Sequence, residues 1–147
     1  MRVVRSLKAL TAARPPAGAV VAVGTFDGVH LGHAAVLGEV LRWAEELGAV
    51  PAVAAFTRPP RSVLGSAERA DLVTSPEHRA RLLGRAGIEL ILELEFTAEL
   101  AALSAEDFAA RYLLGGFAAR GLVLGHDARL GRGGAADPAR RRGVAGV

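Results

Sequence analysis

Hydrophobic and polar residues along the chain alternate between strand-like and helix-like spacing. Residues 19–23 form a continuous apolar run between two glycines, which is typical of a buried strand. In residues 31–47 the apolar positions recur every three to four residues, which predicts a helix that ends near Gly48. Residues 50–56 form a second apolar run. The pattern therefore predicts a strand, a helix and a second strand in succession.

Two polar motifs predict the starts of further helices. Ser75 followed by Pro76 is typical of an N-terminal cap and a first helical residue, and this helix is expected to run to about Ala86, with Gly87 as its C-terminal signal. Ser104, followed by two acidic residues in the first turn, is expected to start a helix that reaches about Leu114.

Residues 88–94 and 121–125 are predicted as two further strands. Strands that alternate with helices form parallel sheets joined by right-handed crossovers. The pattern therefore predicts an α/β protein of the Rossmann-like three-layer type, in which one parallel sheet carries helices on both faces. The length of 147 residues suits a single domain, 1–147.

Ligands of such sheets bind beyond the carboxyl ends of the strands, where the strand order reverses. Three segments follow predicted carboxyl ends, namely 24–30, 57–62 and 125–133, and all are rich in glycine, proline or arginine. We expect the chemistry of the protein to lie there.

The most informative of these segments is the decapeptide Gly-Thr-Phe-Asp-Gly-Val-His-Leu-Gly-His at residues 24–33. It joins a predicted strand to a predicted helix, and the free N–H groups and positive dipole end of a helix start favour phosphate. His30 and His33 are three residues apart, so both lie on one face of a helical first turn and can donate hydrogen bonds to phosphate oxygens. The decapeptide therefore predicts a polyanion site.

Two other interpretations of the histidine pair stay open. The histidines could be incidental residues of a helix start, or they could supply two ligands of a zinc ion. A zinc site needs a third ligand, and because the chain has no cysteine only His78, His126 or a carboxylate could supply it.

Composition limits the class of protein. The hydrophobic fraction of 51% and the charged fraction of 22% are ordinary for a soluble globular protein, and no apolar run approaches the roughly 18 residues of a membrane span. Arg2, Arg5 and Lys8 lie near the N-terminus, but Arg14-Pro15-Pro16 follows in place of an apolar stretch, so a secretory signal is not expected. We expect a cytoplasmic enzyme without a thiol nucleophile or a membrane partner.

The net charge of +3 lies in residues 126–147, which contain five arginines and two aspartates, whereas residues 1–125 hold 13 basic and 13 acidic groups. A basic tail could contact nucleic acid, but this one has no aromatic side chain on which a base could stack. A nucleic-acid partner is therefore not expected.

The decapeptide at 24–33 resembles the signature of the prokaryotic FAD synthetases, in their FMN adenylyltransferase module. The shorter His-x-Gly-His element is similar to that of the wider nucleotidyltransferase superfamily, the HIGH-type fold, which includes pantetheine-phosphate, nicotinate-nucleotide and glycerol-phosphate nucleotidyltransferases. The flanking Phe26-Asp27-Gly28-Val29 points to FAD synthetase. The resemblance implies that ATP contacts Gly24, Thr25, Phe26, Asp27, Gly28, His30 and His33, with the two histidines in the catalytic role. Two alternatives stay open: Phe26 could be a packed core aromatic, and Asp27 could serve only to stabilise the turn before Gly28.

Residues 56–64 read Phe-Thr-Arg-Pro-Pro-Arg-Ser-Val-Leu and correspond to a family stretch that usually reads Phe, acid, Pro, His, Pro, Arg. Here Thr57 replaces the acid and Pro59 the histidine. Arg58 and Arg61 can still meet a flavin phosphate, and a plain solvated loop is the alternative.

Residues 125–133 resemble the family's Gly-Glu-Asp/Asn-Phe-Arg-Phe-Gly loop. The two aromatic positions are Ala128 and Leu130 here, which removes apolar surface around the ligands, and His126 replaces the glutamate. A glycine-rich exit from a strand is the alternative. The matching residues, which we expect at the ligands, are Gly125, Asp127, Arg129 and Gly131.

The family continues with a further strand and a Ser-Ser-Thr-x-x-Arg string expected on the ATP phosphates, and no such string follows Gly133. We also expect no riboflavin kinase module of the kind that follows in bifunctional members. We therefore expect a domain that is incomplete at its C-terminal side, with low activity unless Arg132 or 140–142 substitutes.

The resemblance implies the reaction ATP + FMN → FAD + pyrophosphate, with ATP and FMN as small-molecule substrates and Mg²⁺ bridging the phosphates. Two other functions stay open. The altered segments 57–61 and 126–130 would suit a nucleotidyltransferase for another phosphorylated acceptor, and the missing string would suit a nucleotide-binding remnant without turnover. The oligomeric state is not predicted.

Overall fold

The computed structural model describes residues 1–26, 31–57, 75–95 and 97–124. Within them five strands form one sheet in the order β1-β4-β3-β2-β5, and every neighbouring pair is parallel. The strands are β1 (Arg2–Val4), β2 (Ala19–Gly24), β3 (Val50–Phe56), β4 (Leu90–Leu94) and β5 (Ala119–Leu124).

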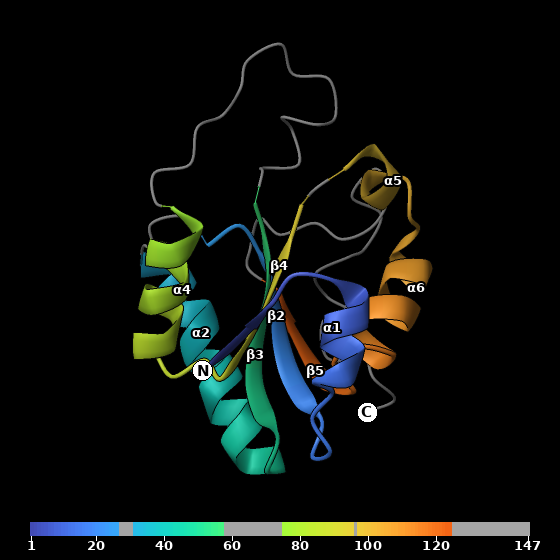
Figure 1. The fold of residues 1–147 in the computed structure, drawn as a ribbon. Helices are drawn as coiled ribbons and strands as arrows, with labels where there is room; N and C mark the ends of the chain where they lie inside the picture. The colour runs from blue at the N-terminus through green and yellow to red at the C-terminus, as the bar shows by residue number, and fades with distance from the viewer. Residues whose placement is uncertain (27–30, 58–74, 96, 125–147) are drawn as a thin grey trace.

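Helices cover both faces of this sheet. Figure 1 shows α2 and α4 on one face and α1 and α6 on the other, while α5 lies toward the end of the sheet where β4 finishes. The helices are α1 (Leu7–Ala12), α2 (Leu31–Leu47), α4 (Pro76–Arg85), α5 (Ala98–Ala101) and α6 (Ala105–Phe108), and a π-helical segment, η2 (Ala109–Leu114), continues α6. The predicted three-layer α/β fold is confirmed.

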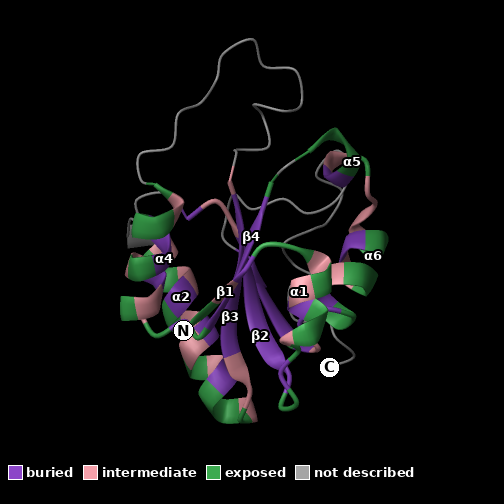
Figure 2. Ribbon diagram, in the orientation of Figure 1, coloured by how far each residue is buried: buried purple, intermediate pink, exposed green. Residues whose placement is uncertain are grey.

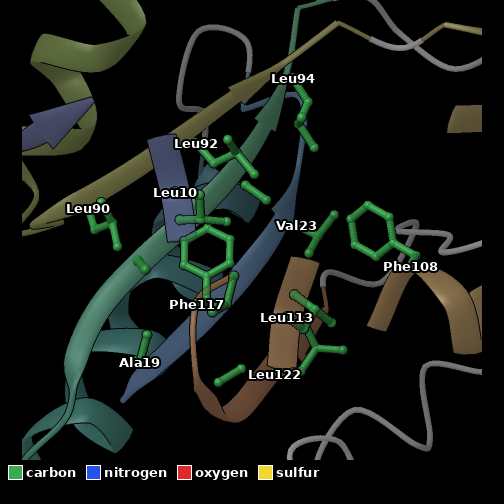
Figure 3. Close-up of a cluster of buried hydrophobic side chains, with 14 of the residues drawn as sticks. Leu10, Ala19, Val23, Leu90, Leu92, Leu94, Phe108, Leu113, Phe117 and Leu122 are labelled. Carbon is green, nitrogen blue, oxygen red and sulfur yellow. The ribbon is translucent and has the colours of Figure 1, made fainter. Parts of the chain in front are cut away.

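The sheet separates two hydrophobic clusters, and strands β2 to β5 are largely buried (Figure 2). The larger cluster lies under α1, α6 and η2 and contains the fully buried Leu10, Leu113 and Phe117 (Figure 3). The second cluster joins β2 and β3 to α2 and α4 through Val40, Leu83 and other apolar side chains. Both faces of the sheet are apolar because helices cover both.

The predicted helix ends are confirmed where capping chemistry marks them. The Ser75 hydroxyl accepts a hydrogen bond from the His78 N–H at 3.1 Å, and Ser104 does the same for Asp107 at 3.0 Å. Gly87 follows α4 with φ +109°, a conformation that favours glycine.

The structure adds elements at the N-terminus that the hydrophobic pattern did not predict. Arg2–Val4 forms the edge strand β1, and Ser6 caps the short helix α1. Because β1 has three residues, its stability comes from pairing with β4 and not from a local pattern. Next to it Arg5 Nε lies 3.0 Å from Oε2 of Glu93, and this ion pair explains how the carboxylate of Glu93 is buried at the end of β4.

Three boundaries also differ from the prediction. The strand expected at residues 88–94 begins two residues later, at Leu90. The last strand begins two residues earlier, at Ala119, and the helix that starts after Ser104 turns π-helical from Ala109. In the π-helical segment the Gly115 N–H bonds to the carbonyl of Ala110, five residues back, a spacing that hydrophobic periodicity does not distinguish from an α-helix.

Among the described residues, no helix combines the length and the apolar composition needed to cross a bilayer.

Candidate functional site

The connectivity of the sheet reverses between β2 and β5. The chain leaves β2 through α2 on one face and reaches β5 through α6 on the opposite face (Figure 1), yet β2 and β5 are neighbours, with Val23 opposite Leu124. The carboxyl ends of β2 and β5 therefore lie next to each other. In doubly wound sheets this is the position where ligands bind.

A strained turn follows β2. Phe26 has φ +52°, a left-handed conformation that is rare for a bulky residue and costs about 1–3 kcal/mol. Its ring is 2% exposed and packs in the cluster under α2. A Cβ on Gly24 would lie 3.2 Å from Cε2 of this ring, so the glycine leaves the space that the ring occupies.

His33 lies in the first turn of α2, against the ring of Phe26. The two ring centroids are 5.0 Å apart with an interplanar angle of 45°, and His33 is half-buried. The turn after β2 thus supports an imidazole at a helix start, where the dipole and the first backbone N–H groups favour an anion.

Arg79 on α4 is the one buried basic side chain among the described residues, with 1% exposure. Its Nη1 donates to the carbonyl of Thr25 at 2.9 Å and to the carbonyl of Phe56 at 2.7 Å. The guanidinium therefore bridges the residues that follow β2 and end β3. The sequence analysis missed Arg79. The sequence does contain an indication of its burial: Arg79 precedes Leu83 by four residues, so both lie on the face of the helix that packs against the sheet.

The structure brings four predicted site residues together, Gly24, Thr25, Phe26 and His33. The buried ring of Phe26 packs in the core and supports His33, and its contact with ATP stays a prediction. The remaining predicted residues lie outside the described ones: Asp27, Gly28, His30, Arg58, Arg61, Gly125, Asp127, Arg129 and Gly131.

No group of three or more histidine, aspartate or glutamate side chains arranged to hold a metal ion occurs within the described ranges. His78, one candidate for a third zinc ligand, is exposed on α4, where its Nδ1 lies 3.4 Å from Nη2 of Arg81.

Comparison with known proteins identifies the family to which the chain belongs. Residues 12–145 match the family described as FAD synthetase. The chain belongs to the FAD synthetase family. The match contains β2, the turn after it and α2, which are the elements that position His33.

Relatives in several bacteria carry the name bifunctional riboflavin kinase/FMN adenylyltransferase. The protein of Bacillus subtilis (strain 168) is 39% identical over 100 residues, which are 67% of this chain and 32% of the relative. That of Pseudomonas fluorescens is 36% identical over 132 residues, 89% of this chain and 41% of the relative, and that of Escherichia coli (strain K12) is 29% identical over 133 residues, 90% and 42%. The chain spans less than half the length of these relatives.

A solved structure shares the fold. The crystal structure of a protein described as a macrolide-efflux protein from Streptococcus pneumoniae is similar with a TM-score of 0.76 and 27% identity, over 88% of this chain and 43% of that one. The similarity supports the sheet order and helix placement described above.

Proposed function

We propose that this protein is an FMN adenylyltransferase, which converts ATP and FMN into FAD and pyrophosphate. The observation that carries the proposal is the position of His33, in the first turn of the helix that follows β2 at the reversal of strand order, within a chain of the FAD synthetase family. The names of the bacterial relatives support the same activity.

In the proposed reaction a phosphate oxygen of FMN attacks the α-phosphorus of ATP, and the bond from that phosphorus to the bridging oxygen breaks as pyrophosphate leaves. The phosphate is itself a nucleophile, so the protein has to position the substrates and neutralise charge on the leaving oxygens. His33, His30 and the backbone N–H groups at the start of α2 are proposed to do this for ATP.

The flavin side of the proposed site rests on segments that follow β3 and β5. Arg58 and Arg61 are proposed to bind the FMN phosphate, because a guanidinium fork matches phosphate geometry. Asp127 and Arg129, between Gly125 and 131, are proposed to line the same edge of the sheet. The support for this is that Phe56 and Leu124, which directly precede these segments in the sequence, are the last residues of the neighbouring strands β3 and β5 on either side of β2.

Mg²⁺ is part of the proposal as the companion of ATP. In phosphoryl and nucleotidyl transfer it keeps several waters and is held largely by substrate phosphates. When bound, it would neutralise part of the charge that develops on the pyrophosphate.

The test is to incubate the protein with ATP, Mg²⁺ and FMN and to measure FAD by chromatography and pyrophosphate by a coupled assay. We expect equal amounts of both products. ATP binding by calorimetry without pyrophosphate release would contradict the proposal and indicate a nucleotide-binding protein without turnover. Pyrophosphate release only with another phosphorylated acceptor would indicate a different nucleotidyltransferase.

A further inference from the structure

Arg79 joins the two loops that the proposed function assigns to different substrates. Thr25 belongs to the decapeptide proposed for ATP, and Phe56 immediately precedes the segment proposed for the FMN phosphate. Both carbonyls accept from the same nitrogen, Nη1, which carries two N–H groups and can donate to both at once. A displacement of either carbonyl therefore changes the geometry at the other.

The position of these carbonyls explains why a buried cation is useful there. β2 and β3 pair as far as Gly24 and Ala55, so Thr25 and Phe56 stand where their ladder ends. Buried carbonyls beyond a ladder need other donors. α4 supplies the donor by presenting Arg79 one turn before the fully buried Leu83.

The strain at Phe26 is the second observation. A left-handed phenylalanine persists only when its surroundings hold it, and the carbonyl to which Arg79 donates belongs to the residue directly before it. The buried ring of Phe26 packs against His33, and the hydrogen bond from Arg79 holds the backbone carbonyl of Thr25 just before it.

We propose that Arg79 is a positioning residue for nucleotidyl transfer, which sets the ATP loop after β2 and the flavin loop after β3 relative to each other. This inference rests on the proposed function for its substrates. Arg79 contacts neither substrate; it acts through the backbone of Thr25 and Phe56. It is distinct from the residues of the decapeptide, which contact the nucleotide directly in the proposed site.

Kinetics of Arg79→Gln give the first test. Glutamine is too short to reach the carbonyls of both Thr25 and Phe56. A smaller fraction of the enzyme then has the geometry that binds the substrates, and the apparent affinity for each substrate falls in proportion to this fraction. We expect the KM for ATP and the KM for FMN to rise together, and kcat/KM to fall by about ten- to hundredfold, as for misplacements of about 1 Å. Arg79→Lys keeps the charge and one set of donors, and its KM values should lie between those of the parent and of Arg79→Gln.

Two variants on the same helix are the controls. Arg81→Gln removes an exposed arginine, and Leu83→Ala removes a fully buried side chain and lowers the melting temperature without touching either carbonyl. A loss of folded enzyme lowers the apparent kcat and leaves both KM values unchanged, so Leu83→Ala should keep the KM values of the parent. If Arg79→Gln keeps both KM values within twofold, raises only one of them, or behaves as Leu83→Ala does, the proposal is wrong.

Hydrogen exchange tests the same role without substrate. In Arg79→Gln, and in Arg79→Lys to a smaller extent, peptides that cover Gly24–Phe26 and Phe56–Thr57 should exchange faster than in the parent, while they should not do so in Leu83→Ala. Unchanged exchange in both peptides would overturn the proposal. A parent protein that makes no FAD, with faster exchange in both peptides of Arg79→Gln, would refute the proposed activity and leave Arg79 as the residue that joins the two loops.

Discussion

His33 shows how a single residue of the decapeptide is held at the start of α2. The imidazole rests on the ring of Phe26, which is itself locked by burial and by a backbone conformation that its neighbours enforce. Gly24 leaves space for that ring, so the glycine, the aromatic residue and the histidine form one packed unit. The sequence left open whether Phe26 contacts the ligand or packs in the core, and the structure buries its ring in the core beside His33, a contact that the sequence did not predict.

Replacing His33 by alanine should weaken ATP binding and leave the fold intact, because the residue is half-buried at a helix start. A hydrogen bond to a charged group contributes about 1.5–3 kcal/mol, so the dissociation constant should rise roughly ten- to hundredfold. Calorimetry with ATP measures this. His78→Ala, on exposed α4, is the matched control and should bind as the parent does. If His33→Ala binds ATP as tightly as His78→Ala does, His33 does not bind the ATP phosphates, and the proposed phosphate site at the start of α2 is wrong.

Glycines decide how closely elements approach each other. A Cβ on Gly121 of β5 would lie 2.8 Å from the Trp43 ring of α2, whereas a Cβ on Gly38, in the same helix as Trp43, would meet nothing within 4 Å. Nothing in the local sequence distinguishes the two glycines, and only the packing around them shows that a side chain fits at Gly38 and not at Gly121.

This contrast gives a paired prediction at the level of elements. Gly121→Ala should lower the free energy of unfolding by about 1–3 kcal/mol, because the tryptophan has to move. Gly38→Ala should raise it by about 0.5–1 kcal/mol, because alanine loses less conformational freedom in a helix. Urea denaturation followed by tryptophan fluorescence and circular dichroism measures both. Similar effects at the two positions would mean that α2 and β5 do not pack as described.

The cap of α4 connects local sequence to the site. Ser75→Ala removes the acceptor for the His78 N–H and should cost about 1 kcal/mol of stability. Since α4 carries Arg79, fraying of its first turn should also speed hydrogen exchange there. Ser75→Asp restores an acceptor and should restore the stability; if it does not, the cap hydrogen bond is not the cause of the loss.

At the scale of the whole molecule, the strength of the local signals decides what the sequence could predict. The strands from β2 to β5 and the long helices follow from apolar runs, helical spacing, serine caps and glycine stops, and they are present close to their predicted bounds. Strand β1 could not be predicted in the same way, because three residues gain their stability only from the neighbouring β4. The role of Arg79 depends on two carbonyls 54 and 23 residues away, which no local pattern contains.

The overall topology unites these observations. The chain order brings the ends of β2 and β5 together at the reversal of the sheet, and α4 adds a buried guanidinium that joins β2 to β3 at the same edge. The carboxyl edge therefore combines a helix start, an imidazole and a buried guanidinium that donates to Thr25 and Phe56. This combination suits the binding of phosphates, and the family of the chain indicates which phosphates to test first.

A crystal structure of the protein with a non-hydrolysable ATP analogue and Mg²⁺ tests the central claim most directly. The account predicts triphosphate density at the first turn of α2, with an oxygen within hydrogen-bond distance of His33 and with Arg79 still donating to Thr25 and Phe56. Nucleotide bound at the opposite edge of the sheet, or a first turn of α2 that stays without nucleotide at saturating concentration, would contradict it.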